Sequence, residues 1–389
     1  MNSTQKISFN GYAALTPNSY QIKVLTSWAE VEAIAMQWDD LHRCTGAAIF
    51  CSMAWMRAQL QTFGASGQLC FVTVWQGDAF AGAATLVKQR MAISKRLGRF
   101  RPQTLTGFVC QYTGHLEFLA RDAAAETALA QAVATTARNM VVDMKLLREG
   151  PMRDKIVSAL LSLGMAPTLK MQFQSAVTDA SMAWEDLLPK LSASFRKDTR
   201  KAERRFAAAG VSVSVFRTGP DDLIERVFSV AKRSWKYKTN TSLASSTAAT
   251  DFVRQIWRVL APKHDLVLTI FSLNDVDFGI CMMLRCNGRW IGIWTDFDEA
   301  YAEFTPGRSG ICRSFDAVMN KGDIEIDVMR RTHFTGAFNG QIYEISRLRA
   351  FPRYSLARWI VWGEGIATST VRKLRLGEGG TKIRRKDVV

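Results

Sequence analysis

The end of one apolar run in this chain carries groups suited to binding a phosphorylated molecule. The run Trp290–Trp294 is rich in strand-forming residues, and a turn with two glycines separates it from a helix predicted over Ile311–Met319. Backbone N–H groups at a helix N-terminus point outward beside the positive end of the helix dipole, so this turn is suited to phosphate. Arg308 and Arg313 would add charge-assisted contacts, whereas an ordinary strand–turn–helix corner is the alternative interpretation. The turn consists of Thr305, Pro306, Gly307, Arg308, Ser309 and Gly310.

The charge of the chain favours an acidic partner. Its 389 residues carry a formal net charge of +16, and 48% of them are hydrophobic. The 11 Trp and 22 Phe exclude a disordered chain, and the length suits two or three domains. A phosphorylated cofactor, a nucleic acid, an anionic glycan and a membrane surface all fit the charge, which does not choose among them.

The cysteines indicate a reducing compartment. There are seven, an odd number, with no C-x-x-C pair and no histidine at the spacing of a zinc ligand, so we expect reduced thiols and no metal. The first residues lack the apolar core of a signal peptide, and no apolar run reaches the ~18–20 residues of a membrane span. We therefore expect a cytoplasmic protein without an integral membrane segment. The Trp359–Trp362 segment leaves peripheral membrane contact open.

Two parts of the chain show the same order of predicted elements. Each has a helix, a hairpin, a strand, a helix and a strand. Each hairpin has a glycine four residues into its second strand, at Gly82 and Gly279. The two parts repeat at a spacing near 200 residues. Such a long spacing predicts tandem copies of one α/β fold rather than a solenoid, with coincidence between generic α/β patterns as the alternative.

A strongly basic helix, predicted over residues 191–209 and ended by Gly210, lies between the two parts. Its six basic residues less Asp198 and Glu203 give a local charge of +4. A block this dense favours phosphates or acidic sugars as partners, and a solvated basic face is the alternative. The basic residues are Arg196, Lys197, Arg200, Lys201, Arg204 and Arg205.

Together these features resemble the GNAT acyltransferases. In that family a hairpin, a strand, a glycine-bearing turn and a helix form the core that binds acetyl-coenzyme A, and the turn holds the pyrophosphate. The duplication resembles the FemAB-like branch and the CelD-like acyltransferases of polysaccharide biosynthesis, which carry an Arg/Lys-rich helix between their halves. They also have an aromatic-and-acid strand before a Pro-Gly turn, like Trp294–Gly307, and a later strand ending in Asp, like Ile324–Asp327.

This resemblance covers most of residues 21–350 and implies the fold class. We expect an α/β protein of tandem GNAT-like domains, each a mixed, mostly antiparallel twisted sheet flanked by helices. The expected parts are a flexible tail (1–20), an N-terminal domain (21–178), a C-terminal domain (179–370) that includes the basic helix 191–209, and a basic tail (371–389).

The sequence departs from the family pattern in two places. After the last strand the family's "D-x-G-x-G…Y-K" is replaced, and Tyr343 is followed by Glu344 rather than Lys, which leaves the substrate class open. The first half has no glycine turn before its second helix, where Phe118–Ala123 stands instead. We therefore expect only the second half to bind the acyl donor.

Acyl transfer from a thioester to an amine needs a positioned donor, a deprotonated nitrogen and N–H groups for the oxyanion. The resemblance assigns the donor's pyrophosphate to Thr305–Gly310. Asp296 or Asp298 would orient or deprotonate the acceptor, and Tyr301 would protonate the leaving thiolate. Alternation would place Trp294 on the face of both aspartates, for which a solvated turn is the alternative interpretation.

Residues that would bind the substrate lie on several predicted elements. Trp235 and its neighbours mix aromatic and cationic groups as glycan and nucleic-acid sites do, with a helix end and a buried Trp235 as the alternative. Asp327 is either a site carboxylate or a helix-cap acceptor, and His333 is interpreted as structural. The candidates are Trp294, Asp327, Arg196, Arg200, Trp235 and Lys236.

The sequence therefore predicts an N-acyltransferase that uses acetyl-coenzyme A or another acyl-coenzyme A as co-substrate. Its acceptor would be an amine of a sugar, a nucleotide-sugar or another small metabolite, or a glycan. An aminoacyl-tRNA-dependent ligase of FemAB type, with tRNA as partner, is the second hypothesis. The third is a non-catalytic module that binds anionic glycan or nucleic acid.

Overall fold

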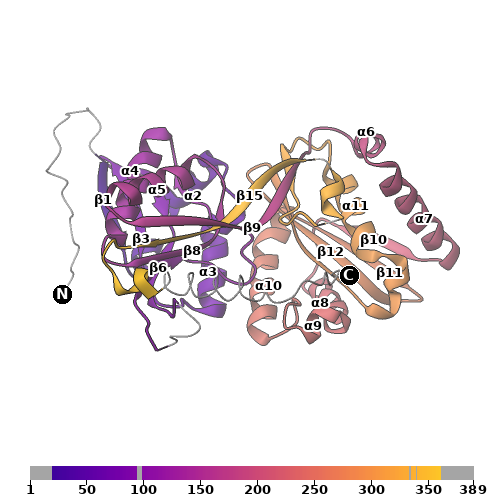
Figure 1. Cartoon of the computed structure of the whole chain (residues 1–389). Coiled ribbons are helices and arrows are strands. Elements are labelled where there is room, and N and C mark those ends of the chain that lie inside the picture. Colours follow the sequence, from indigo (N-terminus) through magenta and orange to yellow (C-terminus); the bar gives the residue numbers. More distant parts are fainter. Residues whose placement is uncertain (1–19, 94–98, 333, 339, 361–389) are drawn as a thin grey trace, which may run out of the picture.

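The computed structural model describes residues 20–93, 99–332, 334–338 and 340–360. Figure 1 shows two lobes: elements from the first part of the chain gather in one and those from the second part in the other. The long strands β9 (Ala166–Asp179) and β15 (Gln341–Phe351) run between the lobes. The predicted tails, residues 1–20 and 371–389, lie outside the described residues except for Tyr20.

The first lobe contains a four-stranded sheet and one end of an eleven-stranded sheet. Helices α4 and α5 pack together beside these sheets (Figure 1). The strands are β1 (Tyr20–Leu25), β2 (Gln68–Leu69), β3 (Phe71–Gln76), β4 (Ala79–Ala84), β5 (Leu86–Arg90), β6 (Gln103–Gly107), β7 (Leu119–Ala120) and β8 (Val141–Arg148). The helices are α1 (Trp28–Glu32), α2 (Ala35–Thr45), η1 (Ile49–Cys51), α3 (Met53–Phe63), α4 (Ala123–Ala137) and α5 (Pro151–Ser162).

The second lobe is built around the other end of the eleven-stranded sheet. Helices α7 and α11 lie on one face of it and α8–α10 on the other (Figure 1). Its strands are β10 (Ser212–Phe216), β11 (Leu266–Leu273), β12 (Val276–Cys286), β13 (Arg289–Phe297) and β14 (Glu325–Asp327). Its helices are α6 (Trp184–Leu187), η2 (Leu188–Lys190), α7 (Ala193–Ala209), α8 (Asp222–Arg233), α9 (Trp235–Lys238), α10 (Thr247–Leu260), η3 (Ala261–Lys263), η4 (Glu299–Phe304), α11 (Pro306–Val318) and η5 (Thr335–Phe338).

Each lobe completes its sheet with a strand supplied by the other part of the chain. The strand order is β10-β11-β12-β13-β14-β9-β15-β8-β6-β5-β2. The C-terminal β15 lies antiparallel between β8 and β9 of the first lobe, while the far end of β9 pairs with β14 of the second. All pairings are antiparallel except β6 with β8 and β13 with β14, one in each lobe.

The predicted duplication is visible in the two hairpins. In β3–β4 the register shifts between Val74 and Trp75, and Gly82 lies opposite Val74. In β11–β12 the register shifts between Phe271 and Ser272, and Gly279 lies opposite Phe271. A bulge increases local twist, so both hairpins bend at the same place before the strand that leads to the next helix.

Several predicted boundaries need correction. The helical pattern predicted over residues 27–60 is three separate helices, because Gly46 ends α2 in the left-handed conformation and Ser52 caps α3. The predicted turn 305–310 is mostly helix, because α11 begins at Pro306, a residue favoured in the first turn. Strands β1, β9 and β15 and helix α5 were not predicted. The basic helix and its stop at Gly210 are confirmed by α7.

Two glycines allow α11 to lie directly against β12. A Cβ added to Gly279 on the strand would stand 2.8 Å from the Cβ of Pro306. A Cβ added to Gly310 on the helix would stand 2.8 Å from the Cβ of Cys281. Farther along, Cys312 and Phe315 pack with Val267 and other residues of the sheet. The start of α11 is thus fixed relative to the end of β13.

This packing predicts opposite effects for the same substitution at two glycines of α11. Gly310→Ala should destabilise the protein by about 1–3 kcal/mol, because the new methyl group overlaps Cys281. Gly307→Ala should be neutral or stabilise it by up to about 1 kcal/mol, because its nearest neighbours are Phe297 atoms 3.9 Å away and alanine favours helix. Denaturant unfolding of both variants checks this. Equal effects would contradict the described packing.

Candidate functional site

The N-terminus of α11 lies just after the end of β13 and has no side-chain cap. Thr305, the residue before the helix, is exposed and has φ 50°, a conformation that is rare and strained for a β-branched residue. Gly307 and Arg308 are half-buried, whereas Ser309 and Gly310 are buried against the sheet. Pro306 is buried as well, so only Thr305, Gly307 and Arg308 of the predicted phosphate-binding residues are accessible to a ligand.

The equivalent helix of the first lobe begins differently. Helix α4 has Asp122 at its N-cap, and one oxygen of that carboxylate accepts from the N–H groups of Ala124 at 3.0 Å and Ala125 at 2.8 Å. A carboxylate thus occupies in α4 the place that a bound anion would take. Of the two related helix starts, only that of α11 remains free of such a carboxylate.

Arg308 and Arg313, predicted to contact phosphate, pair instead with α7. Arg308 donates to Asp198 at 2.6 Å and lies over the ring of Phe334, and Arg313 pairs with Glu203. The Arg308 hydrogen bond lowers the pKa of Asp198. Both acids of α7 are therefore used to attach it to α11.

The remaining charges of α7 form a basic outer face. The exposed residues are Lys197, Arg200, Lys201, Arg204 and Arg205. Arg205 donates to the carbonyl of Glu303, next to the start of α11. Arg196, a predicted substrate ligand, is half-buried and donates to the carbonyls of Pro189 and Leu191, so it holds the turn before α7.

Asp296 is a buried carboxylate with an unused oxygen. It is 3% exposed, and its Oδ1 has no hydrogen-bond partner among the described residues. The Lys236 ammonium lies 3.9 Å from this oxygen and donates to the carbonyl of Thr295. Burial raises the pKa of Asp296, and the charge of Lys236 and contacts with Ser234 and Leu243 oppose part of this shift. Such a perturbed group beside one cation marks a candidate site.

Asp296 and the start of α11 lie on opposite faces of the sheet. Asp296 is opposite Ile280, which packs with α8 and α10, whereas Phe297 is opposite Gly279 on the side of α11. The parallel pairing of β13 with β14 ends at Ile291 and Asp327, yet β13 continues to Phe297. Among the described residues, this edge of β13 beyond Ile291 therefore has no strand beside it, and only an isolated antiparallel bridge joins Asp298 to Ser234.

Trp294 shares the face of Asp296. It packs in the core formed with α8 and α10 and meets the ring of Tyr112 edge-on at 5.6 Å. Tyr112 comes from the first lobe and donates to the carbonyl of Ser242 at 3.3 Å. Burial raises the pKa of Tyr112 to about 12, so its hydroxyl stays protonated. Both lobes thus contribute to the surroundings of Asp296.

Other predicted residues have different surroundings. Asp298 accepts from Arg233 at 2.8 Å and from the N–H of Ala300 at 3.0 Å, so it is bound in the strand-end turn. Tyr301 stacks on Phe278 at 4.7 Å, within an aromatic cluster that includes Phe206 of α7. The structure does not bring Tyr301 to the partners of Asp296.

Trp235, beside Lys236 on α9, is 44% exposed, so the alternative of a buried tryptophan is wrong. Arg200 is exposed, as predicted for a residue of the basic face. His333 lies outside the described residues.

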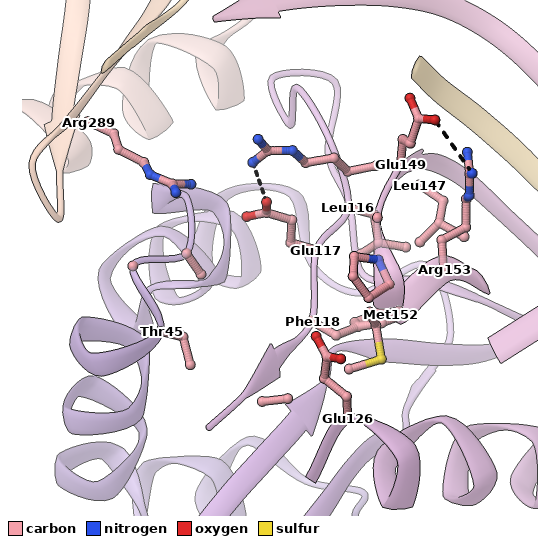
Figure 2. A pocket seen from close by; sticks show the side chains of 16 residues that line it. Thr45, Leu116, Glu117, Phe118, Glu126, Leu147, Glu149, Met152, Arg153 and Arg289 are labelled. Atoms are coloured by element: carbon pink, nitrogen blue, oxygen red, sulfur yellow. Dashed lines mark hydrogen bonds and ion pairs between the residues drawn. The ribbon is translucent and has the colours of Figure 1, made fainter. Parts of the chain in front are cut away.

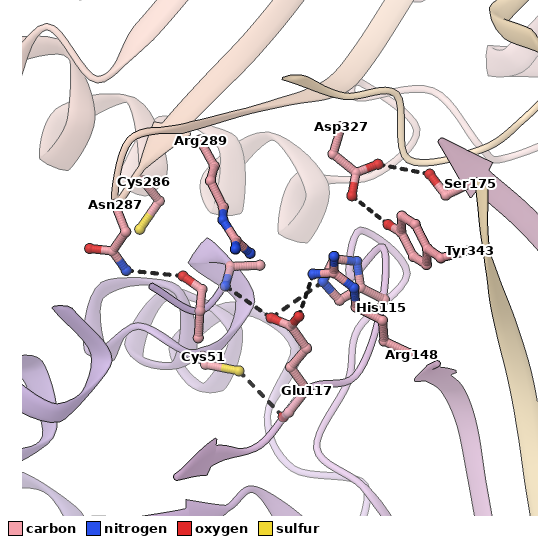
Figure 3. A network of polar contacts seen from close by, with 12 residues as sticks. Cys51, His115, Glu117, Arg148, Ser175, Cys286, Asn287, Arg289, Asp327 and Tyr343 are labelled. Atoms are coloured by element: carbon pink, nitrogen blue, oxygen red, sulfur yellow. Dashed lines mark hydrogen bonds and ion pairs between the residues drawn. The ribbon is translucent and has the colours of Figure 1, made fainter. Parts of the chain in front are cut away.

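Asp327 is the centre of a buried network between the lobes (Figure 3). One oxygen accepts from the hydroxyl of Ser175 and from the N–H of Met329, both at 2.7 Å, and the other accepts from the Tyr343 hydroxyl. Arg148 lies over the Tyr343 ring, 4.5 Å from its centre. Asp327 therefore caps the turn after β14 and joins it to β9 and β15.

The same network continues to Glu117 in the first lobe. Glu117 accepts from the N–H of Ala48 at 3.0 Å and from Arg148 at 2.5 Å. His115 and Arg148 hold the pKa of this half-buried carboxyl well below its usual range, against the effect of burial. His115 is 1% exposed, and neither of its ring nitrogens makes a hydrogen bond, although Nε2 lies 3.5 Å from Glu117.

Glu117 and Arg148 also line a pocket of about 310 Å³ in the first lobe (Figure 2). Its walls come from the end of α2, the segment around β7, the junction of β8 with α5, and Arg289 of the second lobe. The lining residues are Thr45, Gly46, Ala47, Leu116, Glu117, Phe118, Ala120, Glu126, Leu147, Arg148, Glu149, Gly150, Pro151, Met152, Arg153 and Arg289.

Sequence reasoning missed Tyr112, Ser234 and Glu117, because they acquire their roles only when distant segments meet. Tyr343 was noticed only as the residue before a departure from the family pattern. The one available signal was the run of polar residues at 111–115, which stands just before the apolar stretch Leu116–Leu119 and belongs to no predicted element.

Within the described residues, no group of three or more His, Cys, Asp or Glu could hold a metal ion, and no helix has the length and hydropathy to cross a membrane. All seven cysteines are free; Cys44 is exposed and four are buried.

Comparison with known proteins identifies the second lobe. Residues 193–338, which make up much of the second lobe, match the family model described as acetyltransferase (GNAT) domain. Proteins with curated descriptions give no match to this sequence.

Solved structures extend the likeness over both lobes. FemX superposes with a TM-score of 0.55 at 11% identity, over 84% of this chain and 97% of FemX. The C-terminal domain of a protein described as a lysylphosphatidylglycerol synthetase from Agrobacterium fabrum gives 0.52 at 8% identity, over 86% and 96%. At these identities the likeness concerns the fold alone. The predicted fold class, tandem GNAT-like α/β domains, is confirmed.

The network predicts that Tyr343→Phe destabilises the protein. Removing the hydroxyl takes a donor from the buried Asp327 carboxylate, which should cost about 1.5–3 kcal/mol. Tyr354→Phe is the matched control, because Tyr354 is 82% exposed and should change stability by less than about 0.5 kcal/mol. Denaturant midpoints measure both. Equal stability of the two variants would show that the Asp327 network contributes nothing.

Proposed function

We propose that this protein is an N-acyltransferase that moves an acyl group, acetyl in the simplest case, from acyl-coenzyme A to an amine of a sugar, a nucleotide-sugar or another small metabolite. The observation that carries the proposal is a buried carboxylate with an unused oxygen, Asp296, at the end of the strand that leads to the uncapped helix α11. The GNAT-type domain over residues 193–338 supports the same class of reaction.

The donor's pyrophosphate binds at the start of α11. Pro306 has no N–H, and the N–H groups of Arg308 and Ser309 donate to the carbonyl of Thr305. The N–H of Gly307 and the positive end of the helix dipole attract an anion, and Gly307 leaves room for it. The opposite arrangement at α4, where Asp122 supplies the anion, explains why the first lobe does not bind a donor there.

Asp296 receives the acceptor amine. An ammonium group beside Oδ1 would gain the hydrogen bond that the structure leaves unmade, and the raised pKa of Asp296 suits it to take a proton. The positive charge of Lys236 opposes part of the effect of burial on the pKa of Asp296 and disfavours a charged amine close by. The deprotonated nitrogen attacks the thioester carbonyl, a C–N bond forms as the C–S bond breaks, and coenzyme A leaves as a thiolate that takes up the proton lost from the nitrogen.

The unpaired edge of β13 provides the connection between the two groups. Because the pyrophosphate and Asp296 lie on opposite faces, the extended arm of the donor passes the sheet where β13 and β14 separate. The thioester then reaches the face of Asp296, Trp294 and Lys236.

An aminoacyl-tRNA-dependent ligase is the second candidate, and the basic outer face of α7 favours it. Five exposed cations along one helix suit a phosphodiester backbone. This candidate requires activity that falls steeply with salt, whereas transfer from acyl-coenzyme A requires only a mild dependence.

A matched pair of substitutions at Thr305 tests the donor site. Thr305→Asp places a negative charge at the start of α11 and should weaken acetyl-coenzyme A binding about tenfold or more, because it repels the pyrophosphate. Thr305→Asn has the same shape without the charge and should bind nearly as well as the original protein. Calorimetric titration measures the three dissociation constants.

Equal binding of acetyl-coenzyme A by Thr305→Asp and Thr305→Asn would show that the donor does not bind at the start of α11. Absence of acetyl-coenzyme A binding by the unsubstituted protein would reject the proposed donor. Aminoacyl-tRNA at low and high salt would then be tested as the alternative.

Asp296→Asn should separate catalysis from donor binding. Turnover, measured as thiol release from acetyl-coenzyme A with a panel of amino sugars and nucleotide-linked amino sugars, should fall about 100-fold or more. Acetyl-coenzyme A affinity should stay unchanged. Asp298→Asn is the control and should lower stability rather than turnover, because Asp298 binds Arg233 and caps the turn. Unchanged turnover in Asp296→Asn would exclude Asp296 as the base.

The carboxyl group of Asp296 also predicts how activity and stability depend on pH. Its pKa is raised in the folded protein, so kcat/KM should fall as the pH drops below that value. The free energy of unfolding should change in the opposite direction and fall as the pH rises. The buried charge costs nothing below the pKa of an unfolded aspartate, about 3.9, and its full cost is reached once the pH has risen through the pKa of Asp296 in the folded protein. At neutral pH, Asp296→Asn should therefore raise the melting temperature, and a lower one would contradict the unpaired carboxylate.

A further inference from the structure

The pocket of the first lobe lies where the segment ending in β7 meets the end of β8. Leu116 and Leu147 form an isolated parallel bridge there, and both line the pocket. Helices α4 and α5 follow these two segments, so the pocket is a cleft near the starts of both helices.

This cleft is not suited to the pyrophosphate of an acyl donor. The start of α4 is capped by Asp122, which uses the N–H groups of Ala124 and Ala125. The volume of about 310 Å³ admits a metabolite of the size of a sugar phosphate rather than a coenzyme.

One part of the pocket lining suits an anion. Helix α5 begins at Pro151 without a side-chain cap, and Met152 and Arg153 of its first turn line the pocket. The guanidinium groups of Arg148, Arg153 and Arg289 come from three different elements around it (Figure 2). A helix start together with guanidinium groups is a strong site for phosphate.

Another part of the lining suits a cation. Glu117 is ionised at any ordinary pH, and Glu126 and Glu149 add two further carboxylates to the pocket. The C-terminal end of α2, Thr45–Ala47, contributes the negative end of a helix dipole. These charges have ion-pair partners in the structure: Arg148 pairs with Glu117 at 2.5 Å, Lys155 with Glu126 at 2.6 Å, and Arg289 with Glu325 at 3.0 Å, while Arg153 lies 3.0 Å from Asp154 and 3.8 Å from Glu149. A ligand with both charges can exchange partners with such pairs, whereas a plain anion would leave a carboxylate without its cation.

The polar network behind the pocket is incomplete. His115 is buried beside Glu117: its Nε2 lies 3.5 Å from a Glu117 oxygen, the ion pair drawn in Figure 3, but neither ring nitrogen has a hydrogen bond among the described residues. Buried polar groups normally have partners, and an unpartnered one calls for an explanation. A bound ligand that moves Glu117 or Arg148 slightly would bring a partner to His115.

The pocket is separate from the site around Asp296. Arg289 and Asp296 stand at opposite ends of β13, seven residues apart, which is about 23 Å along a strand. Tyr112 packs on Trp294, and Met329 fills the space at Gly114, so closely packed side chains lie between them. A small ligand in the pocket does not reach Asp296.

We infer that the first-lobe pocket is a second binding site, for a small phosphate monoester that carries an amine. The phosphate binds at the start of α5 with Arg153 and Arg289, and the ammonium group binds toward Glu117 and Glu126. Arg289 belongs to β13, so the ligand contacts both lobes and stabilises their packing.

Calorimetric titration of the full chain with glucosamine 6-phosphate tests this inference. Two analogues, glucose 6-phosphate and glucosamine, each lack one of the charged groups. Glucosamine 6-phosphate should bind at least about tenfold more tightly than either, because each charged hydrogen bond lost costs that much or more. The titration contains no acyl donor, so its outcome is independent of the proposed function.

Variants locate the site. Arg153→Ala and Arg289→Ala should each weaken glucosamine 6-phosphate binding about tenfold, and Met152→Trp should abolish it by filling the pocket. Arg258→Ala removes an exposed arginine of α10 and should leave binding unchanged. Acetyl-coenzyme A should bind Arg289→Ala as well as the original protein. Melting temperatures without ligand confirm that each variant is folded.

Three results would overturn the inference. The first is no binding of glucosamine 6-phosphate at 10 mM, about ten times the 1 mM dissociation constant of a weak site. The second is equal affinity for glucosamine 6-phosphate, glucose 6-phosphate and glucosamine. The third is full affinity for glucosamine 6-phosphate in each of the single variants Arg153→Ala, Arg289→Ala and Met152→Trp. If one of the three variants does not fold, the other two decide the outcome.

Discussion

The pairing of β9 with β15 is the constraint on which both lobes depend. The two strands pair from Gln341 and Val177 to Phe351 and Ala166, across nearly their whole length. Since β9 also holds β14 and β15 also holds β8, neither lobe has a complete sheet without a segment of the other part of the chain. The relative position of the lobes is thus fixed by backbone hydrogen bonds. The contacts of the Asp327 network and of Arg289, which join the two lobes, depend on that position.

On this shared frame, two copies of one fold have diverged at their helix starts. A single carboxylate, Asp122, closes the anion site of α4, whereas α11 begins with a strained threonine and no cap. The acids of α7 that could have neutralised the region are used by Arg308 and Arg313. The difference between a helix start that is open to an anion and one that is closed therefore rests on a few polar side chains.

The sequence carried the local part of this structure. Hydrophobic periodicity, glycines and helix caps located the two hairpins, helices α4, α7 and α8, and strand β14 (Glu325–Asp327), because these elements follow from neighbouring residues. Strand β15 could not be predicted, because polar residues stand among its apolar ones as they do in a loop. Its partner residues in β9 also lie about 170 residues earlier in the chain.

The candidate site shows the same limit. The sequence singled out Asp296 and the turn before α11, but it could not show that Asp298 is held by Arg233 or that Ser309 and Gly310 face the sheet. The side chains of Arg308 and Arg313 point toward α7, and the position of α7 does not follow from the residues next to them in the sequence. The pocket of the first lobe had no sequence signal, since its lining comes from five separate segments.

The place of β15 also sets the order of events during synthesis. Chains fold as they leave the ribosome, N-terminal parts first. Strands β8 and β9 emerge early, yet the strand that lies between them is among the last described segments to appear. Their facing edges stay open while about 160 further residues are made, and open edges attract other strands. The nascent chain is therefore most prone to aggregate before residue 351 is available, and slow translation of the second lobe prolongs that exposure.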